Sequence, residues 1–187
     1  MKMLLHICCA PCSVAIAEQL LEEPGMVLEG YFFNPNIHPE EEYAKRKASV
    51  KAMAEDLQFS ISFNDLNQLD FWRSELSQDK NSRCAYCYTS RLEETAKFAE
   101  QKGFDAFSTS LLISPYQNHE LIAQLGKKIA ADHHISFYYQ DFRPLYRKGR
   151  EKARAKNWYM QKYCGCFYSY NESDHPKKPI YFIESIL

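Results

Sequence analysis

Short apolar runs alternate with longer amphipathic stretches along most of this chain. Five apolar runs have the length of buried strands, at residues 3–7, 27–33, 59–63, 105–109 and 136–139. Four stretches carry apolar residues at helical spacing, at residues 13–21, 40–57, 84–102 and 118–133. Strands that alternate with helices pair in parallel and are covered by helices on both faces. The pattern therefore predicts an α/β fold, a three-layer sandwich with a mostly parallel sheet.

The length and charge of the chain narrow its class. Its 187 residues suffice for one domain, which we expect to span 1–187 and to bury roughly 70% of the unfolded surface. The 23 basic and 24 acidic residues nearly cancel, so the overall charge indicates no polyanionic partner. No run of 18 apolar residues occurs, and the apolar start at 3–5 is too short for a signal peptide. We expect a cytoplasmic protein without a membrane partner.

All seven cysteines lie in three short runs, at 8–12 (CCAPC), 84–87 (CAYC) and 164–166 (CGC). Cysteines that serve only as small buried hydrophobes have no reason to cluster in this way. Metal ligation and thiol redox chemistry have that reason, because both need several sulfurs close together. An odd number of clustered cysteines also fits a reducing compartment better than a secreted disulfide framework.

The first two runs can form one site. Cys8, Cys9 and Cys12 lie between the first strand and the first helix, at the strand end where open α/β sheets usually bind ligands. Cys84 and Cys87 are three apart on one face of an expected helix. Four thiolates from two places can hold an iron–sulfur cluster or a zinc ion, whereas the CAPC run alone has the form of a thioredoxin-type dithiol. The residues leave these three alternatives open.

The third run, Cys164 and Cys166, favours redox chemistry. A disulfide across one intervening residue closes a small strained ring, and strain makes a disulfide easier to reduce. Such a pair suits electron relay better than stabilisation. The alternative is a pair of additional metal ligands.

After Asp141 the alternation stops and a basic stretch begins. Residues 143–162 hold eight cations against the single acid Glu151, with three aromatic residues interleaved. Cations with interleaved aromatics can bind RNA backbone and bases, with Lys152 and Arg154 as expected contacts, although a solvated helix face is the alternative. Outside the main pattern we expect a helical piece at 69–76 and a late strand at 180–186.

Two histidines are candidate functional residues. His6 lies in the first strand, where a core residue with satisfied hydrogen bonds is expected rather than a ligand. His119 opens a helix beside the polar loop 114–118, which could hold a small ligand at the carboxyl edge of the sheet.

Five segments together resemble the cobalamin-independent epoxyqueuosine reductases: HICCAPC at 6–12, YFFNPNI at 31–37, RCAYCY at 83–88, LLISPYQ at 111–117 and QKYCGC at 161–166. The resemblance runs in register from about residue 4 to 169, and none of its segments is missing. It implies a fold similar to the nucleotide-binding α/β sandwiches of the PP-loop ATPases. It also implies reduction of epoxyqueuosine, carried at the wobble position of tRNA, to queuosine.

The resemblance assigns roles to the cysteines. Cys8, Cys9, Cys84 and Cys87 match the ligands of a 4Fe-4S cluster, and Cys164 with Cys166 matches a redox-active disulfide. An additional iron beside the cluster is implied, with Cys12 as its candidate ligand where some members carry an aspartate, and no cobalamin is used. A thiolate and a carboxylate prefer different metals.

The same resemblance implies the partners. These are tRNA carrying epoxyqueuosine and an external electron donor, and a basic segment at about 143–170 would close over the site. Ser114, Tyr116 and Gln117 are our candidates for holding the modified base. A thioredoxin-like dithiol oxidoreductase and a zinc-stabilised RNA-binding module are the alternative functions.

Overall fold

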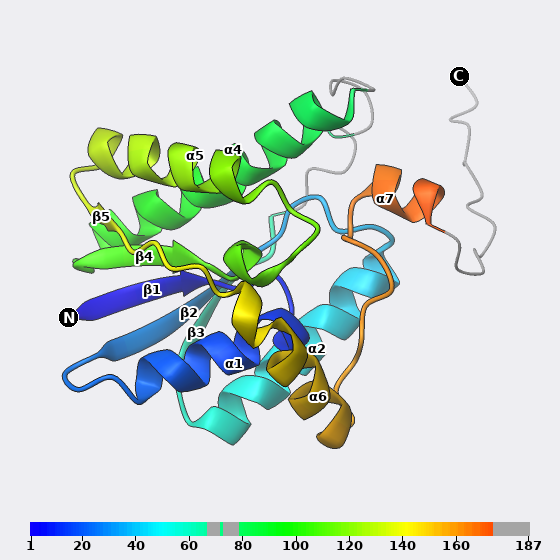
Figure 1. Ribbon diagram of the computed structural model, residues 1–187, viewed down its shortest axis with the longest axis horizontal. Helices are drawn as coiled ribbons and strands as arrows, with labels where there is room; N and C mark the ends of the chain where they lie inside the picture. Colours follow the sequence, from blue (N-terminus) through cyan, green and yellow to red (C-terminus); the bar gives the residue numbers. More distant parts are fainter. Residues whose placement is uncertain (67–71, 73–78, 174–187) are drawn as a thin grey trace.

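Five parallel strands form the centre of the molecule, in the order β3-β2-β1-β4-β5. The computed structural model describes residues 1–66, 72 and 79–173. The strands are β1 (Lys2–His6), β2 (Val27–Phe33), β3 (Ile61–Asn64), β4 (Ala106–Thr109) and β5 (Ser136–Phe137) (Figure 1). All five of the predicted strands are present, each within a few residues of its expected bounds.

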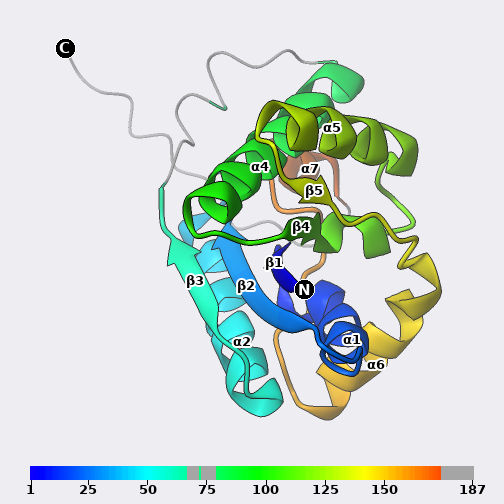
Figure 2. The ribbon, with the colours of Figure 1, turned by 90° about the vertical axis from the view of Figure 1, so that its left-hand side faces the viewer.

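Helices cover both faces of this sheet. Figures 1 and 2 show α1 (Ala10–Leu21) and α2 (Glu40–Leu57) on one face and α4 (Lys80–Gln101) and α5 (His119–Asp132) on the other. The predicted three-layer sandwich with a parallel sheet is therefore confirmed. Within the described residues, no helix is both long and apolar enough to cross a bilayer.

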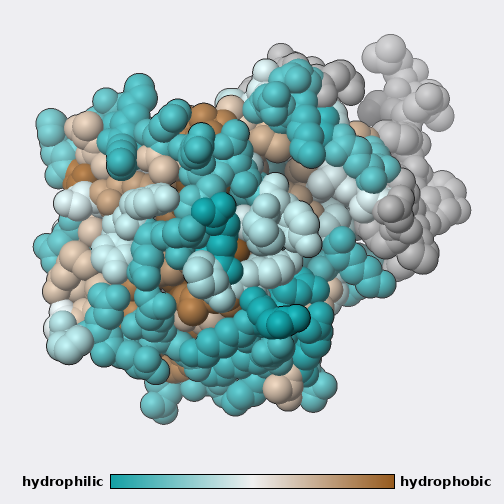
Figure 3. All heavy atoms as spheres, in the orientation of Figure 1, coloured by the Kyte–Doolittle hydropathy of each residue, from teal (hydrophilic) through white to brown (hydrophobic). Residues whose placement is uncertain are grey.

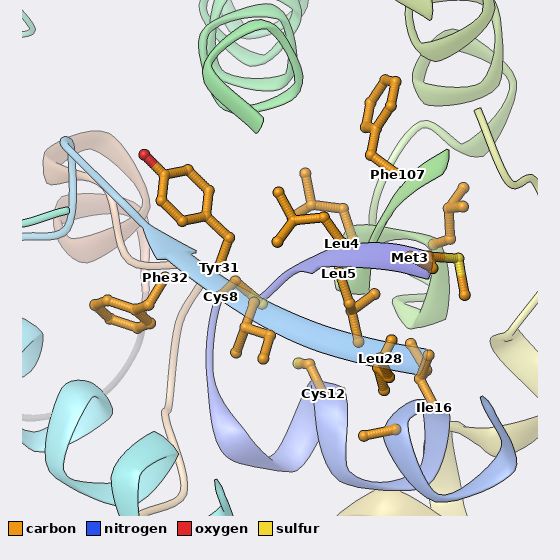
Figure 4. Close-up of a cluster of buried hydrophobic side chains, with 14 of the residues drawn as sticks. Met3, Leu4, Leu5, Cys8, Cys12, Ile16, Leu28, Tyr31, Phe32 and Phe107 are labelled. Atoms are coloured by element: carbon orange, nitrogen blue, oxygen red, sulfur yellow. The ribbon is translucent and has the colours of Figure 1, made fainter. Parts of the chain in front are cut away.

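The apolar strands explain why the sheet lies in the middle. In β1, Met3, Leu4 and Leu5 are fully buried although neighbouring residues point to opposite faces. Figure 4 shows Tyr31 and Phe107 on one side of the sheet and Ile16 and Cys12 on the α1 side. A strand covered on both faces reads as a continuous apolar run, as these strands do.

The chain reverses its winding at β1. This strand pairs with β2 on one side and with β4 on the other, so the connections after β1 and β4 lead to opposite faces of the sheet. After β1 the chain enters α1, and after β4 it enters the 3-10 helix η1 (Ser110–Ile113). Open α/β sheets bind ligands at the carboxyl ends of strands at such a switch point.

The basic stretch contains a helix, which the sequence indicated only as the alternative of a solvated helix face. After η2 (Arg143–Leu145), α6 (Tyr146–Ala155) packs against α1, and α7 (Phe167–Glu172) follows the last cysteine. A Cβ at Gly149 would lie 2.7 Å from the Pro11 carbonyl oxygen, so only glycine allows this approach. On the face seen in Figure 1, hydrophilic side chains cover α6 (Figure 3).

Two helix starts differ from expectation. The side chain of Asp79 accepts a hydrogen bond from the Ser82 amide at 2.8 Å, which lets α4 begin at Lys80 instead of residue 84. Helix α1 begins at Ala10, because Pro11 suits the first turn of a helix. The expected helical piece 69–76, apart from Trp72, and the late strand 180–186 lie outside the described residues.

Candidate active site

Cysteines from three distant parts of the chain line one cavity. Its volume is about 660 Å³, and its walls include Cys8 and Cys12 from the start of the chain, Cys87 from α4 and Cys164 from the C-terminal segment. Ser110 and Leu111, which follow β4, also line it, so the cavity lies at the switch point of the sheet.

The first three cysteines form a tight group. The Sγ atoms of Cys8, Cys9 and Cys12 all lie within 4.8 Å of one another, and those of Cys8 and Cys9 are 3.7 Å apart. All three side chains are buried. The Ser110 hydroxyl accepts from the Cys8 amide at 3.0 Å and donates to the Cys8 Sγ at 3.3 Å, which ties this group to the end of β4.

One side chain from the C-terminal segment contacts this group. The Gln161 amide donates to the Sγ atoms of Cys9 at 2.9 Å and Cys12 at 3.3 Å. Hydrogen bonds from Cys12 and Cys9 lower the pKa of Cys8, whereas desolvation raises the pKa of Cys9. The three thiols therefore affect one another's ionisation, and hydrogen bonds within the group favour the thiolate form of Cys8.

Cys84 and Cys87 lie on α4 and are half-buried. The Cys87 Sγ accepts from the Asn36 amide at 3.4 Å, and Asn36 accepts from Arg91 at 2.7 Å. Burial raises the pKa of Cys87 to about 12. Burial, followed by the nearby Cys164 and Cys166 thiols, raises the pKa of Cys84. In the described chain, neither α4 cysteine belongs to a close group of three metal-ligating side chains like the one at Cys8.

The last two cysteines are free thiols, and Cys164 lines the cavity. Cys164 is exposed, and its Sγ accepts from the Gln117 amide at 3.5 Å. Cys166 precedes α7, where its Sγ accepts from the Ser169 amide at 3.4 Å. The structure thus brings Cys164 to the same cavity as Cys8 and Cys87.

The cavity is cationic. Four basic side chains line it and no acidic side chain of the described residues does; the four are Arg46, Arg91, Arg150 and Lys162. Ser114, Tyr116 and Gln117, the candidates for holding a modified base, also line it. Tyr116 is 81% exposed, so its ring is open to a ligand at the mouth. Gln117 accepts from the Tyr88 hydroxyl at 2.6 Å, which fixes its amide.

Much of the basic stretch is neutralised within the chain. Lys152 forms an ion pair with Glu18, Lys156 with Asp56, and Arg143 with Asp141. Lys148 and Arg147 are also near acids, at 3.9 Å and 3.8 Å. The charge of Lys152 is thus compensated by Glu18. Arg150, Arg154 and Lys162 have no ion pair among the described residues, so their charges are available to a ligand.

The two histidines have structural surroundings. His6 is fully buried between the Thr109 hydroxyl at 2.9 Å and the Phe33 carbonyl at 3.0 Å, and burial lowers its pKa to about 4. His6 is therefore a satisfied core residue, as predicted. His119 lies 3.0 Å from the Leu112 carbonyl oxygen and is not part of the cavity wall.

Several residues of the site had no role predicted from the sequence, among them Asn36, Arg46, Arg91, Ser110 and Gln161. Each acts across a long separation in the chain, as with Gln161 and Cys9. Asn36 and Gln161 stand inside segments that carried the family resemblance, which was a usable signal. Arg46 follows Glu42 by four residues on α2, but this spacing is equally typical of a surface ion pair.

Residues 3–172 match the sequence model of a family described as epoxyqueuosine reductase QueH. The chain belongs to this family. The QueH of Dehalococcoides mccartyi is 32% identical over 179 residues, which cover 95% of this chain and 98% of the relative. The QueH of Acinetobacter baylyi is 37% identical over 183 residues, covering 92% and 82%. As a family member the chain is an enzyme, an epoxyqueuosine reductase of queuosine biosynthesis.

A solved structure shows the same fold. The U34-tRNA thiolase NcsA from Methanococcus maripaludis, determined with its 4Fe-4S cluster, aligns with a TM-score of 0.57 and 15% identity. The alignment covers 90% of this chain, which spans 61% of the length of that one. This likeness shows that the two chains share an α/β fold.

Proposed function

We propose that this chain reduces epoxyqueuosine in tRNA to queuosine with a 4Fe-4S cluster bound to Cys8, Cys9, Cys84 and Cys87. The observation that carries the proposal is the convergence of three separate cysteine runs on one cavity at the switch point of the sheet. Family membership supplies the reaction, and the cavity supplies a place for it.

The donor set fits a cluster better than one zinc ion. At a Zn–S distance of about 2.3 Å, four tetrahedral thiolates lie about 3.8 Å apart. Cys84 and Cys87 do not join Cys8 and Cys9 in a group of that tightness. A cluster is wider than a single ion, because its iron and sulfide atoms separate the thiolates. Cys12, in contact with both Cys8 and Cys9, is the candidate ligand of an additional iron.

The overall reaction balances with the C-terminal dithiol. An epoxide and two thiols give an alkene, water and a disulfide, so two electrons and two protons leave Cys164 and Cys166. When bound, the cluster supplies electrons one at a time and the additional iron supplies a Lewis acid. An external electron donor then reduces the disulfide. Exposure of Cys164 at the border of the cavity suits both exchanges.

The walls of the cavity suit one nucleotide of an RNA loop. A volume of about 660 Å³ lies within the range of about 300–1,000 Å³ that is typical of small-ligand pockets. The wobble nucleotide therefore has to leave the anticodon stack to enter. Arg150 and Lys162 can bind the flanking phosphates, and the exposed Tyr116 can stack on a neighbouring base.

The C-terminal part of the chain closes this site. Tyr146 and Arg150 of α6 and the run from Met160 to Cys164 form one wall of the cavity. We therefore propose a single catalytic domain in which the segment at about 143–170 covers the cluster. The free thiols along the chain favour a reducing compartment such as the cytoplasm.

Metal analysis of anaerobically purified protein tests the proposal, together with conversion of epoxyqueuosine-containing tRNA. We expect brown protein with iron and sulfide, sulfur-to-iron absorbance near about 400 nm, and product without added cobalamin. Colourless protein that reduces disulfides but not tRNA would identify a dithiol oxidoreductase. Stoichiometric zinc, with RNA binding and no product, would identify a zinc-stabilised module.

A further inference from the structure

A buried arginine lies directly beneath the Cys164-Gly165-Cys166 run. Arg46, on α2, is only 2% exposed. Its guanidinium does not reach solvent and faces the C-terminal segment instead. A buried cation is costly unless hydrogen bonds and an opposite charge compensate it, so its partners indicate why the position is held.

Three nitrogens of this guanidinium have assigned partners. Nε donates to the Glu42 carboxylate at 2.7 Å. Nη1 donates to the carbonyl of Cys164 and Nη2 to that of Tyr163, each at 2.9 Å. The second carboxylate oxygen of Glu42 accepts from the Tyr159 hydroxyl. Two of the hydrogen bonds of the buried arginine therefore go to the backbone that carries Cys164.

The same segment is held from its other side. The His38 amide donates to the Gly165 carbonyl at 2.7 Å, and the Tyr163 hydroxyl donates to the His38 carbonyl. Gly165 has φ +127°, and a Cβ there would lie 2.9 Å from Arg46 Nη1. The glycine between the two cysteines thus lets the backbone rest on the guanidinium.

We propose that Arg46, with Glu42, is a positioning residue that fixes Cys164 at the wall of the cavity. The inference rests on the proposed redox role of Cys164 and Cys166 and adds what holds them in place. A planar fork can bind two consecutive carbonyls and a carboxylate at once, whereas an ammonium group on a flexible stem cannot. The position therefore requires arginine and not merely a positive charge.

The test compares Arg46→Lys and Arg46→Gln with wild-type holoenzyme, using epoxyqueuosine-containing tRNA. We expect kcat to fall between about tenfold and a hundredfold in both, because a reacting group is misplaced. KM for tRNA and the iron content should stay near wild type. Iodoacetamide should alkylate Cys164 several-fold faster, as measured by peptide mass spectrometry. Wild-type kcat and alkylation in Arg46→Lys would overturn the inference.

Three further variants keep the test decisive. Lys51→Gln, at an exposed position on α2, is the control and should match wild type. If the Arg46 variants do not fold, Gly165→Ala probes the same contact from the side of the C-terminal segment while Arg46 and Glu42 both remain, and it should show the same changes. Full multiple turnover in Cys166→Ser would refute the redox role instead, while the alkylation rates would still report whether Arg46 holds Cys164.

Discussion

The thiols on the two sides of the cavity are held in different ways. Cys8, Cys9 and Cys12 are buried at a strand–helix junction, where the backbone belongs to the sheet and to α1. Cys164 is exposed on a segment between α6 and α7, and side chains of other elements fix it. A rigid buried group suits permanent ligation, whereas an accessible thiol suits repeated exchange. Under the proposed function, the comparison separates the side that would hold a cofactor from the side where electrons would enter.

The largest effect on iron content and activity should come from a substitution in the buried group of Cys8, Cys9 and Cys12. Cys8→Ser removes a proposed cluster ligand whose Sγ lies 3.7 Å from that of Cys9. We expect loss of most bound iron and a fall in activity of at least about a hundredfold, since loss of even an outer-shell partner can reach that size. Iron analysis and the visible spectrum under anaerobic conditions measure it.

Cys12→Ser is the matched control, because Cys12 belongs to the same close group but not to the proposed cluster ligands. It should keep the iron and sulfide of the cluster. If Cys12→Ser loses all iron while Cys84→Ser keeps it, the ligand set is the close group and our assignment is wrong.

A substitution in the C-terminal pair, Cys164 and Cys166, should affect turnover but not iron content. Cys166→Ser removes one thiol of the proposed redox pair but no cluster ligand, so iron content should equal that of wild type. Turnover beyond the first cycle should stop, because no disulfide can form within the pair. Product formation with tRNA in excess over enzyme measures this. Undiminished multiple turnover would remove the dithiol from the reaction.

The cationic wall supplies the third prediction. Arg150→Glu with Lys162→Glu should weaken tRNA binding and lower the slope of log K against log salt by up to about two. Lys152→Gln is the control, because Lys152 is already paired with Glu18 and should contribute less. Binding titrations at several salt concentrations decide it. If Lys152→Gln weakens binding equally, the RNA-binding surface includes the exposed part of α6 and is not confined to the cavity wall.

The fourth prediction concerns the packing of α6 against α1. Gly149→Val would force a side chain into a contact where Cβ alone lies 2.7 Å from the Pro11 carbonyl oxygen. We expect destabilisation of about 1–3 kcal/mol in thermal unfolding, which is typical of overpacking. Arg147→Val, on the exposed side of the same helix, should change stability far less. Similar melting temperatures for the two would contradict the close approach of α6 to α1.

The smallest effect concerns the helix that carries Cys84 and Cys87. His133, after α5, contacts Glu100 at 2.9 Å and Glu93 at 2.7 Å on α4, and these hydrogen bonds raise the pKa of His133 above its ordinary 6.5. Its stabilisation is complete below the unfolded pKa and disappears as pH rises through the higher folded pKa.

Both glutamates are half exposed, so His133→Gln should cost less than about 1 kcal/mol near pH 6 and nothing near pH 9. Urea unfolding at both pH values measures the difference. An equal cost at both would show that the ring packs there without carrying charge.

The strands and helices of the fold could be predicted from the sequence more completely than the residues of the site. The bounds of β2 and α2 agree with the predicted 27–33 and 40–57. Apolar periodicity indicates that a strand or helix is present, but it did not indicate that α2 buries Glu42 and Arg46. The packing of α6 against α1 was not predicted, because the face that meets α1 consists of small residues, Gly149 and Ala153, within a strongly charged sequence. Arg46 could not be recognised, because its role depends on carbonyls of residues 163 and 164 that no local pattern brings near.

The hydrogen bond from Gln161 to Cys9 joins residues 152 positions apart. During synthesis at about 5–20 residues per second, the opening turn therefore spends roughly 8–30 s without the side chain that later contacts it. Until residue 161 is made, the Cys9 and Cys12 thiols lack this hydrogen-bond donor, although the four proposed cluster ligands are all present once residue 87 has been added. The proposed cluster site is thus complete in sequence well before the segment that covers it, and that segment closes over it last.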